Sequence, residues 1–226
     1  MRVDWVTVAD LGTALGTLVL AAATFSAVRS GNRTARAAEH SLLAGLRPLL
    51  ITSRLEDPLL KISFMDRKWV RVPGNCAVAE MGGGDGTGGP QDDVIYLALS
   101  LRNVGSGIAV LHGWVFYPER LTAPADHPRP GEFRPLIRDL YIPPADTGFW
   151  QCAFRDVAEP GYESARKVID SRVPWTVDLL YGDHEGGQRV ISRFSMLPRD
   201  DGTWFAAVAR HWNIDRPDPR DRPGPG

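Results

Sequence analysis

The stretch VIYLALSLRNVGSGIAVLHGWVFY, residues 94–117, decides the fold class. In its first half, apolar side chains alternate with mixed ones at a period of two, which is typical of a strand with one buried face. The Gly-Ser-Gly sequence at 105–107 is a turn signal. The second half is again rich in branched and aromatic residues. The pattern therefore predicts two strands, 94–104 and 108–117, paired as a hairpin.

Runs of the same kind flank this stretch and are separated by turns rich in Gly and Pro. One internal segment, residues 162–170, has the spacing of a short helix instead. Many short strands with one internal helix predict a mainly β domain over residues 48–212, an antiparallel β-sandwich of immunoglobulin-like architecture. The further predicted strands are 49–53, 59–64, 68–72, 76–81, 135–142, 149–155, 175–181, 188–197 and 203–209.

Tryptophan is frequent, with seven in 226 residues. Large aromatic side chains fill the space between packed strands, so we expect most of those in strands to lie in the core. An exposed one marks a binding surface. The tryptophans in predicted strands are Trp69, Trp114, Trp150, Trp175 and Trp204.

An uncharged stretch precedes the strands: residues 11–28, LGTALGTLVLAAATFSAV. As a helix that rises about 1.5 Å per residue, it covers roughly 27 Å, close to the hydrocarbon thickness of a bilayer. The sequence predicts a transmembrane helix here, within an anchor of residues 1–30; its marker residues are Leu11, Gly12, Gly16, Leu20 and Val28. A helix buried in a globular core and a secretory signal peptide are the alternatives.

The flanks of this stretch predict an orientation. Trp5 precedes it at a depth suited to an interfacial anchor, and Arg29, Arg33 and Arg36 follow it. By the positive-inside rule, we expect a single-pass protein of the cell membrane with its N-terminus outside and its β domain in the cytoplasm. The arginines are also candidates for contact with anionic lipid headgroups. The opposite topology is the alternative.

Residues 31–47 carry an apolar stripe at helical spacing and predict an amphipathic helix beside the membrane. The Ser-Gly-Asn sequence at 30–32 either bends the chain or is absorbed into one long helix. Gly12 and Gly16 form a GxxxG pattern, which lets two membrane helices approach closely. A homodimer through these glycines is therefore one expectation, beside the lipid bilayer itself as partner.

A search for chemical signatures predicts no catalytic, cofactor-binding or metal-binding residue. The glycines at 84–89 match G-x-G-x-x-G formally, but they lie in a low-complexity loop that leads into a predicted strand. A dinucleotide site needs a helix at that point. Zinc-ligand spacing and the G-x-S-x-G motif are both missing from the sequence. The net charge of -1 gives no reason to expect a nucleic-acid partner.

The leading hypothesis is a non-enzymatic interaction module that binds an unknown protein or small ligand at the cytoplasmic membrane face. The alternative is a membrane-tethered hydrolase with a non-standard site, in which His112, His184 or Cys152 converge with a carboxylate. Cys76 and Cys152 are expected to be buried, reduced thiols, although an exported domain would let them pair. The tail, residues 213–226, is expected to be disordered.

Three segments also carry a resemblance: ARAAEHSLLAGLRPLL (35–50), YLALSLRNVGSGIAVL (96–111) and LLYGDHEGGQRVISRFSM (179–196). With them the chain resembles uncharacterised bacterial single-pass proteins that have an N-terminal transmembrane helix and a β-sandwich domain. The motifs are structural, formed by helix ends and hairpin turns. The resemblance implies a membrane-anchored accessory module and transfers no catalytic residue.

Overall fold

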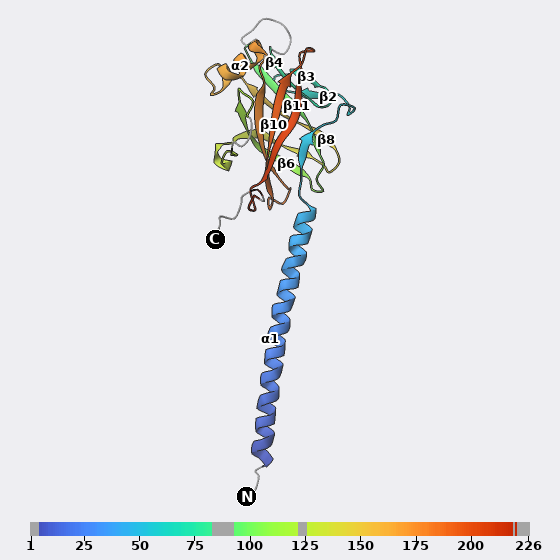
Figure 1. Ribbon diagram of the computed structural model, residues 1–226, viewed down its shortest axis with the longest axis vertical. Helices are drawn as coiled ribbons and strands as arrows, with labels where there is room; N and C mark the ends of the chain where they lie inside the picture. Colours follow the sequence, from blue (N-terminus) through green and yellow to red (C-terminus); the bar gives the residue numbers. More distant parts are fainter. Residues whose placement is uncertain (1–4, 83–92, 122–125, 219, 221–226) are drawn as a thin grey trace. The chain divides into compact units, whose positions relative to one another are not determined.

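The computed structural model describes residues 5–82, 93–121, 126–218 and 220 (Figure 1). Within these, the side chains of residues 5–14, 40, 43 and 44 lie outside the description. The chain divides into two compact units, Met1–Gly45 and Leu46–Gly226.

The first unit is one α-helix, α1 (Trp5–Gly45), of 41 residues. The two predicted helical segments are therefore continuous, and the Ser-Gly-Asn sequence at 30–32 is absorbed into the helix. Pro48 follows soon after its end, and a residue before proline avoids the helical conformation. Among the residues that the structure describes, no helix is long and apolar enough to cross a membrane. The predicted span begins at Leu11, and side chains up to residue 14 lie outside that description.

The second unit consists mainly of strands. Its one α-helix in the described ranges is α2 (Tyr162–Ser171), and a short 3-10 helix, η1 (Pro130–Glu132), precedes β7. The strands are β1 (Leu50–Thr52), β2 (Leu60–Ser63), β3 (Trp69–Val72), β4 (Cys76–Met81), β5 (Ile95–Asn103), β6 (Ala109–Tyr117), β7 (Arg134–Ile142), β8 (Thr147–Phe154), β9 (Trp175–Gly182), β10 (Arg189–Pro198) and β11 (Trp204–Asn213).

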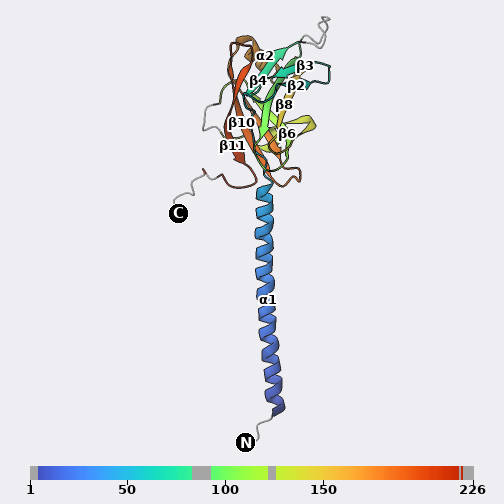
Figure 2. The ribbon, with the colours of Figure 1, turned by 90° about the vertical axis from the view of Figure 1, so that its right-hand side faces the viewer.

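Nine of these strands form one curled antiparallel sheet (Figures 1 and 2). β8 pairs with one edge of β5, while β1 and β4 share the other edge. From β4 the sheet continues through β11, β10, β9 and β6 to β7. β2 and β3 form a separate hairpin. The predicted class, mainly β and antiparallel, is confirmed; an immunoglobulin-like sandwich of two separate sheets is not, because these strands share one hydrogen-bonded sheet.

The predicted hairpin of residues 94–104 with 108–117 is wrong, although both strands exist. β5 pairs with β1, β4 and β8, whereas β6 pairs with β7 and β9. The glycines between the two strands allow the main chain of residues 46–49 to come close. A Cβ atom at Gly105 would lie 2.4 Å from the Arg47 carbonyl oxygen, and one at Gly107 would lie 1.6 Å from that of Leu46. The Gly-Ser-Gly sequence therefore lets the chain pass the entry to β1 instead of reversing into a hairpin.

The core lies inside the curl and is dominated by aromatic side chains. Trp150, Trp175 and Trp204 are fully buried, and Trp114 is nearly so. The exception among the predicted core tryptophans is Trp69, which is 63% exposed on β3. α2 covers the core with Tyr162, Ala165 and Val168, which confirms the predicted short helix.

The C-terminal boundary differs from the prediction. β11 extends to Asn213, and Asp215 forms an ion pair with Arg47 at 2.5 Å. Arg47 also donates to the Asn213 side chain at 2.9 Å. The predicted disordered tail of 213–226 thus starts too early, because its first residues pair with the segment that leads into β1. Residues 219 and 221–226 lie outside the described part.

Candidate functional site

The curled sheet has a seam where its two ends meet. β7 pairs only with β6, and β8 pairs only with β5, as far as the described strands show. The two strands follow each other in the chain and lie side by side without a ladder of hydrogen bonds between them. Strand edges that face each other unpaired leave main-chain and side-chain groups open to a ligand. This seam is the candidate site.

One end of the seam is closed by packing. Gly148, near the start of β8, faces Ile142 at the end of β7. A Cβ atom at position 148 would lie 2.6 Å from Cγ1 of Ile142, so the branched side chain fills the space that glycine leaves. The seam therefore begins tightly packed beside the turn that connects β7 to β8.

The other end is bridged by an ion pair. Arg134, the first residue of β7, pairs with Glu159 at 2.5 Å. The guanidinium group lies over the rings of Trp114, at 5.2 Å, and Phe154, at 5.6 Å. Burial alone raises the pKa of Glu159, but hydrogen bonds from the main-chain N–H of Arg155 and from Arg134 hold it below its ordinary value. We call the Arg134–Glu159 pair the clasp.

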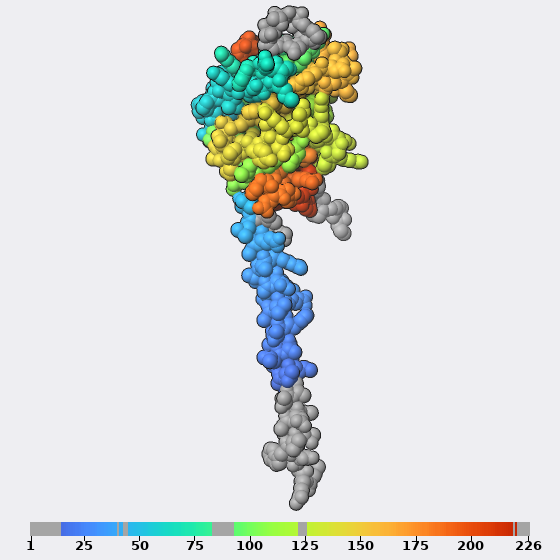
Figure 3. All heavy atoms as spheres, turned by 180° about the vertical axis from the view of Figure 1, so that it is seen from behind, coloured from blue at the N-terminus to red at the C-terminus, as the bar shows by residue number. Residues whose placement is uncertain are grey.

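Between the packed end and the clasp lies a narrow slot with a volume of about 80 Å³. Figure 3 shows this face, where the residues of β7 and β8 (yellow) lie beside the β2–β3 hairpin (cyan). Most of the lining is apolar, and the guanidinium groups stand among these side chains. The residues that line the slot are Phe64, Met65, Trp114, Arg134, Pro135, Leu136, Ile137, Arg138, Leu140, Gln151, Cys152, Ala153 and Arg155.

The alternation of β7 explains the mixed character of the slot. Arg134, Leu136, Arg138 and Leu140 share one face of the strand, as the period of two requires. Arg138, on this face, is exposed. It forms no ion pair with any residue the structure describes. An apolar slot with a free guanidinium group at its rim fits a ligand that is apolar at one end and anionic at the other.

Two further polar groups line the slot. The Oε1 atom of Gln151 is buried and has no hydrogen-bond partner among the described atoms. Cys152 is a free thiol, and burial raises its pKa well above the ordinary value. A thiol that stays protonated at neutral pH is a weak nucleophile. The orphaned amide oxygen instead favours a ligand with a hydrogen-bond donor.

The candidate residues of the hydrolase hypothesis are spread over the second unit. Cys152 lies in the seam, with Arg134, Glu159 and Arg155 as its charged neighbours. His112 is the bulge residue of β6, where Asp139 and Asp183 are near, and burial lowers its pKa. His184 lies in the turn after β9. The convergence that this hypothesis depends on is not found, and the described side chains hold no group of three metal ligands.

The two cysteines are separated by a strand. Cys76 is on β4 and Cys152 is on β8, and β5 lies between the two strands. Neighbouring strands are about 4.8 Å apart, so the Cα atoms are roughly 10 Å or more apart, which is too far for a disulfide. Both thiols are buried and free, as predicted for the reduced form.

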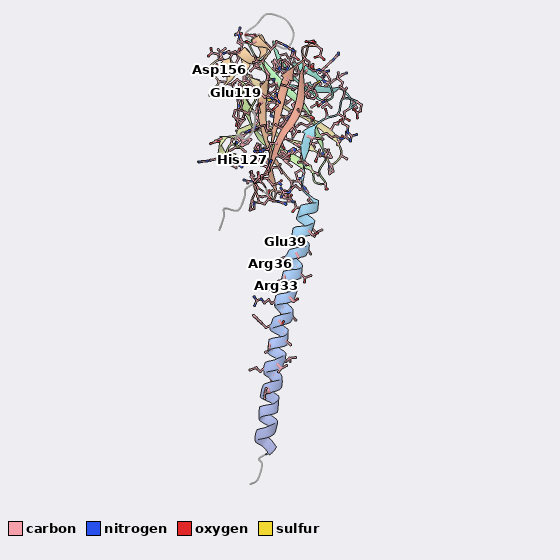
Figure 4. All side chains as sticks on the ribbon, viewed as in Figure 1. Arg33, Arg36, Glu39, Glu119, His127 and Asp156 are labelled. Carbon is pink, nitrogen blue, oxygen red and sulfur yellow. The ribbon has the colours of Figure 1, made fainter. Side chains whose placement is uncertain are left out.

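The predicted anchor residues lie on α1. The side chains of Trp5, Leu11 and Gly12 fall outside the description, whereas those of Leu20 and Val28 are exposed. A Cβ atom at Gly16 would meet no other atom within 4 Å. The predicted topology residues Arg29, Arg33 and Arg36 are exposed as well; Figure 4 labels the last two with Glu39.

Sequence reasoning missed a buried hydrogen-bond chain that joins β1, β9, β10 and β11. The Leu50 N–H donates to the Tyr181 hydroxyl, which lies 2.7 Å from Ser192 Oγ. Ser192 Oγ lies 2.6 Å from His211 Nδ1. Ser192 is fully buried, so no substrate reaches this serine–histidine pair. Only the cross-strand register, which places Ser192 opposite His211, reveals it.

Comparison with known proteins adds no family to this geometry. No protein-family model matches the chain, and no curated protein matches it either. The geometry of the seam is therefore the support for the candidate site.

Proposed function

We propose that this protein is a non-enzymatic binding module, held at the cytoplasmic face of the membrane by α1, that takes its ligand in the seam between β7 and β8. One observation carries the proposal: the curled sheet stays unpaired at these two strands and leaves an apolar slot with arginines at its rim. A seam without function would be expected to close with a ladder of hydrogen bonds, because an open edge invites unwanted pairing.

The exposed apolar surface of α1 supports the membrane part of the proposal. Leu15, Leu18, Leu20 and Phe25 are more than half exposed, and they lie on several sides of the helix. A helix that is apolar all round needs lipid or protein around it. The Thr24 hydroxyl donates to the Leu20 carbonyl at 2.8 Å, so it needs no water.

Membrane anchoring is tested with two matched leucines of α1. Leu20 is 69% exposed inside the uncharged stretch, and Leu42 is 71% exposed outside it. An arginine near the centre of a span costs about 2.5–3.5 kcal/mol on an insertion scale. We therefore expect Leu20→Arg, and not Leu42→Arg, to move the full chain from the alkali-washed membrane pellet to the supernatant. Equal behaviour of the two variants contradicts anchoring.

Orientation is tested with an exposed thiol, because both native cysteines are buried. The Arg71→Cys variant places one on the outer face of β3. A membrane-impermeant maleimide is expected to label it only after lysis of the cells that produce it. Labelling of intact cells would place the β domain outside.

The Gly12/Gly16 homodimer is proposed as a secondary role of the same helix. A side chain at position 16 meets nothing within 4 Å in the single chain. Gly16→Leu is therefore expected to leave the fold unchanged and to weaken dimerisation, which cross-linking in membranes measures. An unchanged cross-linked fraction rejects the dimer.

Ligand entry at the seam is tested through Cys152, with iodoacetate and iodoacetamide as a charged and a neutral probe of similar size. Arginines at the rim are expected to raise the rate of iodoacetate relative to iodoacetamide, and Arg138→Glu is expected to lower this ratio about threefold or more. Arg71→Glu, also an exposed strand arginine, is the control. Mass spectrometry of the Cys152 peptide gives both rates. A ratio that Arg138→Glu and Arg71→Glu change equally contradicts the proposed slot.

A further inference from the structure

The edge of β8 that faces the seam carries free main-chain groups at alternate residues. The Asn103 N–H of β5 donates to the Asp146 carbonyl, so residue 146 turns toward β5. Thr147 and Arg155 turn away, because their N–H groups donate to the side chains of Asp146, at 2.7 Å, and Glu159, at 2.8 Å.

The register of β8 with β5 is unbroken from Thr147 to Phe154. Main-chain direction alternates along a strand, so the N–H and C=O groups of Phe149, Gln151 and Ala153 also point away from β5. No described strand pairs with them. This edge is therefore a template of evenly spaced donors and acceptors.

The surroundings of this edge add side-chain recognition. The slot beside Cys152 and Trp114 accepts an apolar side chain, and the unpartnered Gln151 Oε1 accepts a hydrogen bond. Three arginines rim the slot; Arg134 is held by Glu159 and Arg155 lies 3.7 Å from Asp66, which leaves Arg138 for a ligand carboxylate.

We propose that the ligand of the seam is an extended peptide segment that adds as a strand to the free edge of β8. Its main chain pairs with Phe149, Gln151 and Ala153, an apolar side chain enters the slot, and an acidic side chain meets Arg138. This inference rests on the proposed function of the seam as the binding site. It names the class of partner: a protein with an exposed, acidic and apolar extended segment.

A second copy of the chain fits this edge less well. Pairing the same edge of two copies would bring a second set of Arg134, Arg138 and Arg155 to a rim where arginines already outnumber the carboxylates of Glu159 and Asp66. Like charges placed close together oppose pairing. An acidic segment neutralises the excess instead.

The first test selects peptides from a random dodecamer phage library on the full chain in mild detergent. We expect enriched sequences that combine alternating apolar residues with an acid. Their synthetic peptides are expected to bind about tenfold more weakly to Arg138→Glu and to Leu136→Trp, which fills the slot. The controls are Arg71→Glu and Tyr141→Trp, whose side chains are exposed on the outer face of β3 and on the face of β7 opposite Leu136, outside the slot lining.

The second test measures hydrogen exchange of the β8 amides with the strongest-binding peptide present, because strand addition protects only alternate amides. Strand addition is expected to slow exchange of the Phe149, Gln151 and Ala153 amides by about tenfold or more, while the amides of Trp150 and Cys152, already paired with β5, change little. Protection without alternation shows that a peptide binds in another way, and the inference fails while the proposed function stands.

The remaining outcomes separate the two proposals. If no peptide is enriched but iodoacetate is still preferred at Cys152, the slot takes a small anion and the strand-addition inference is wrong. If the charge preference is also absent, both proposals fail. Sedimentation that shows a dimer disrupted by Leu136→Trp, and not by Tyr141→Trp, assigns the edge to a second copy and overturns the peptide partner.

Discussion

Two regions of the sheet each hold an arginine–carboxylate pair over aromatic rings, and the two pairs differ in burial. In the first, Arg193 forms a bidentate pair with Asp178 at 2.8 and 2.7 Å and lies over the rings of Tyr117 and Trp212. In the second, the clasp, Arg134 pairs with Glu159 and lies over Trp114 and Phe154. The side chains are 4% and 0% exposed in the first pair, and 44% and 21% in the second.

The difference follows from what covers each pair. A segment before β7 lies over the first, since Arg193 donates to the Asp126 carbonyl and His127 packs edge-on against Trp212. Figure 4 labels His127 and Glu119 of this segment. Nothing comparable covers the clasp in the described part of the chain. The buried Arg193–Asp178 pair therefore stabilises the fold. The partly exposed Arg134–Glu159 pair contributes less to stability, and a ligand can separate its two side chains.

The largest effect is expected from Asp178→Asn, which turns the buried acid into an amide and removes the carboxylate that neutralises the buried Arg193 guanidinium group. Burial already raises the pKa of Asp178 even with the guanidinium group beside it, so the site tolerates lone charge poorly. We expect a loss of about 3–5 kcal/mol in the free energy of unfolding. Urea denaturation of the full chain, followed by tryptophan fluorescence, measures it. A loss below about 1 kcal/mol would show that the cover does not seal this pair.

Next in size is the pH dependence from His211, which lies in the buried hydrogen-bond chain of Tyr181 and Ser192. Burial lowers its pKa to about 4, and Arg220 adds to the effect. The unfolded chain therefore binds the proton first as the pH falls. Stability is full above about pH 6.5 and declines by about 3 kcal/mol between pH 6.5 and 4.

The variant His211→Asn tests this assignment, since it keeps an acceptor for Ser192 without the titration. It is expected to flatten the stability curve between pH 6.5 and 4. His184→Gln, in the exposed turn after β9, is the control and should leave the curve as it is. A curve that both variants leave unchanged shows that other groups cause the acid dependence.

A smaller effect is expected where the seam is packed. In Gly148→Ala the new Cβ atom meets Ile142 Cγ1 at 2.6 Å, so the Ile142 side chain must move. We expect a loss of about 1–2 kcal/mol, since overpacking of this size costs 1–3. In the Ile142→Ala background the same substitution should cost almost nothing, which a double-mutant cycle measures. Additive losses would locate the strain elsewhere than in this contact.

The strands could be predicted from the sequence, but the partners of β5 could not. Alternation and turn residues located every strand from β1 to β11, because the period of two is local information. The partner of β5 depends on how closely Gly105 and Gly107 approach residues 46–49, and that distance is set by the tertiary fold. The hairpin prediction failed for this reason.

The candidate site could not be predicted from the sequence either, because it too depends on the tertiary fold. The sequence of β7 presents Arg134, Leu136, Arg138 and Leu140 on one face, which reads as an ordinary amphipathic strand. Only the unpaired seam makes that face a slot lining. The search for catalytic motifs passed over it because its chemistry lies in ordinary residues at an unclosed edge, for which no short motif exists.

The smallest effect on stability is expected at the clasp, with the same chemical change as in the sealed pair. Glu159→Gln keeps an oxygen to accept from the Arg155 and Asp156 N–H groups and removes only the charge that holds Arg134. Because the pair is open to solvent, we expect a loss below about 1 kcal/mol. The slot itself should respond more, with Cys152 reacting about threefold faster with iodoacetamide once Arg134 is released. An acid-to-amide change that is costly at Asp178, nearly neutral at Glu159 and yet raises access to Cys152 would establish the clasp as a gate. A slower or unchanged reaction would make it one more surface ion pair.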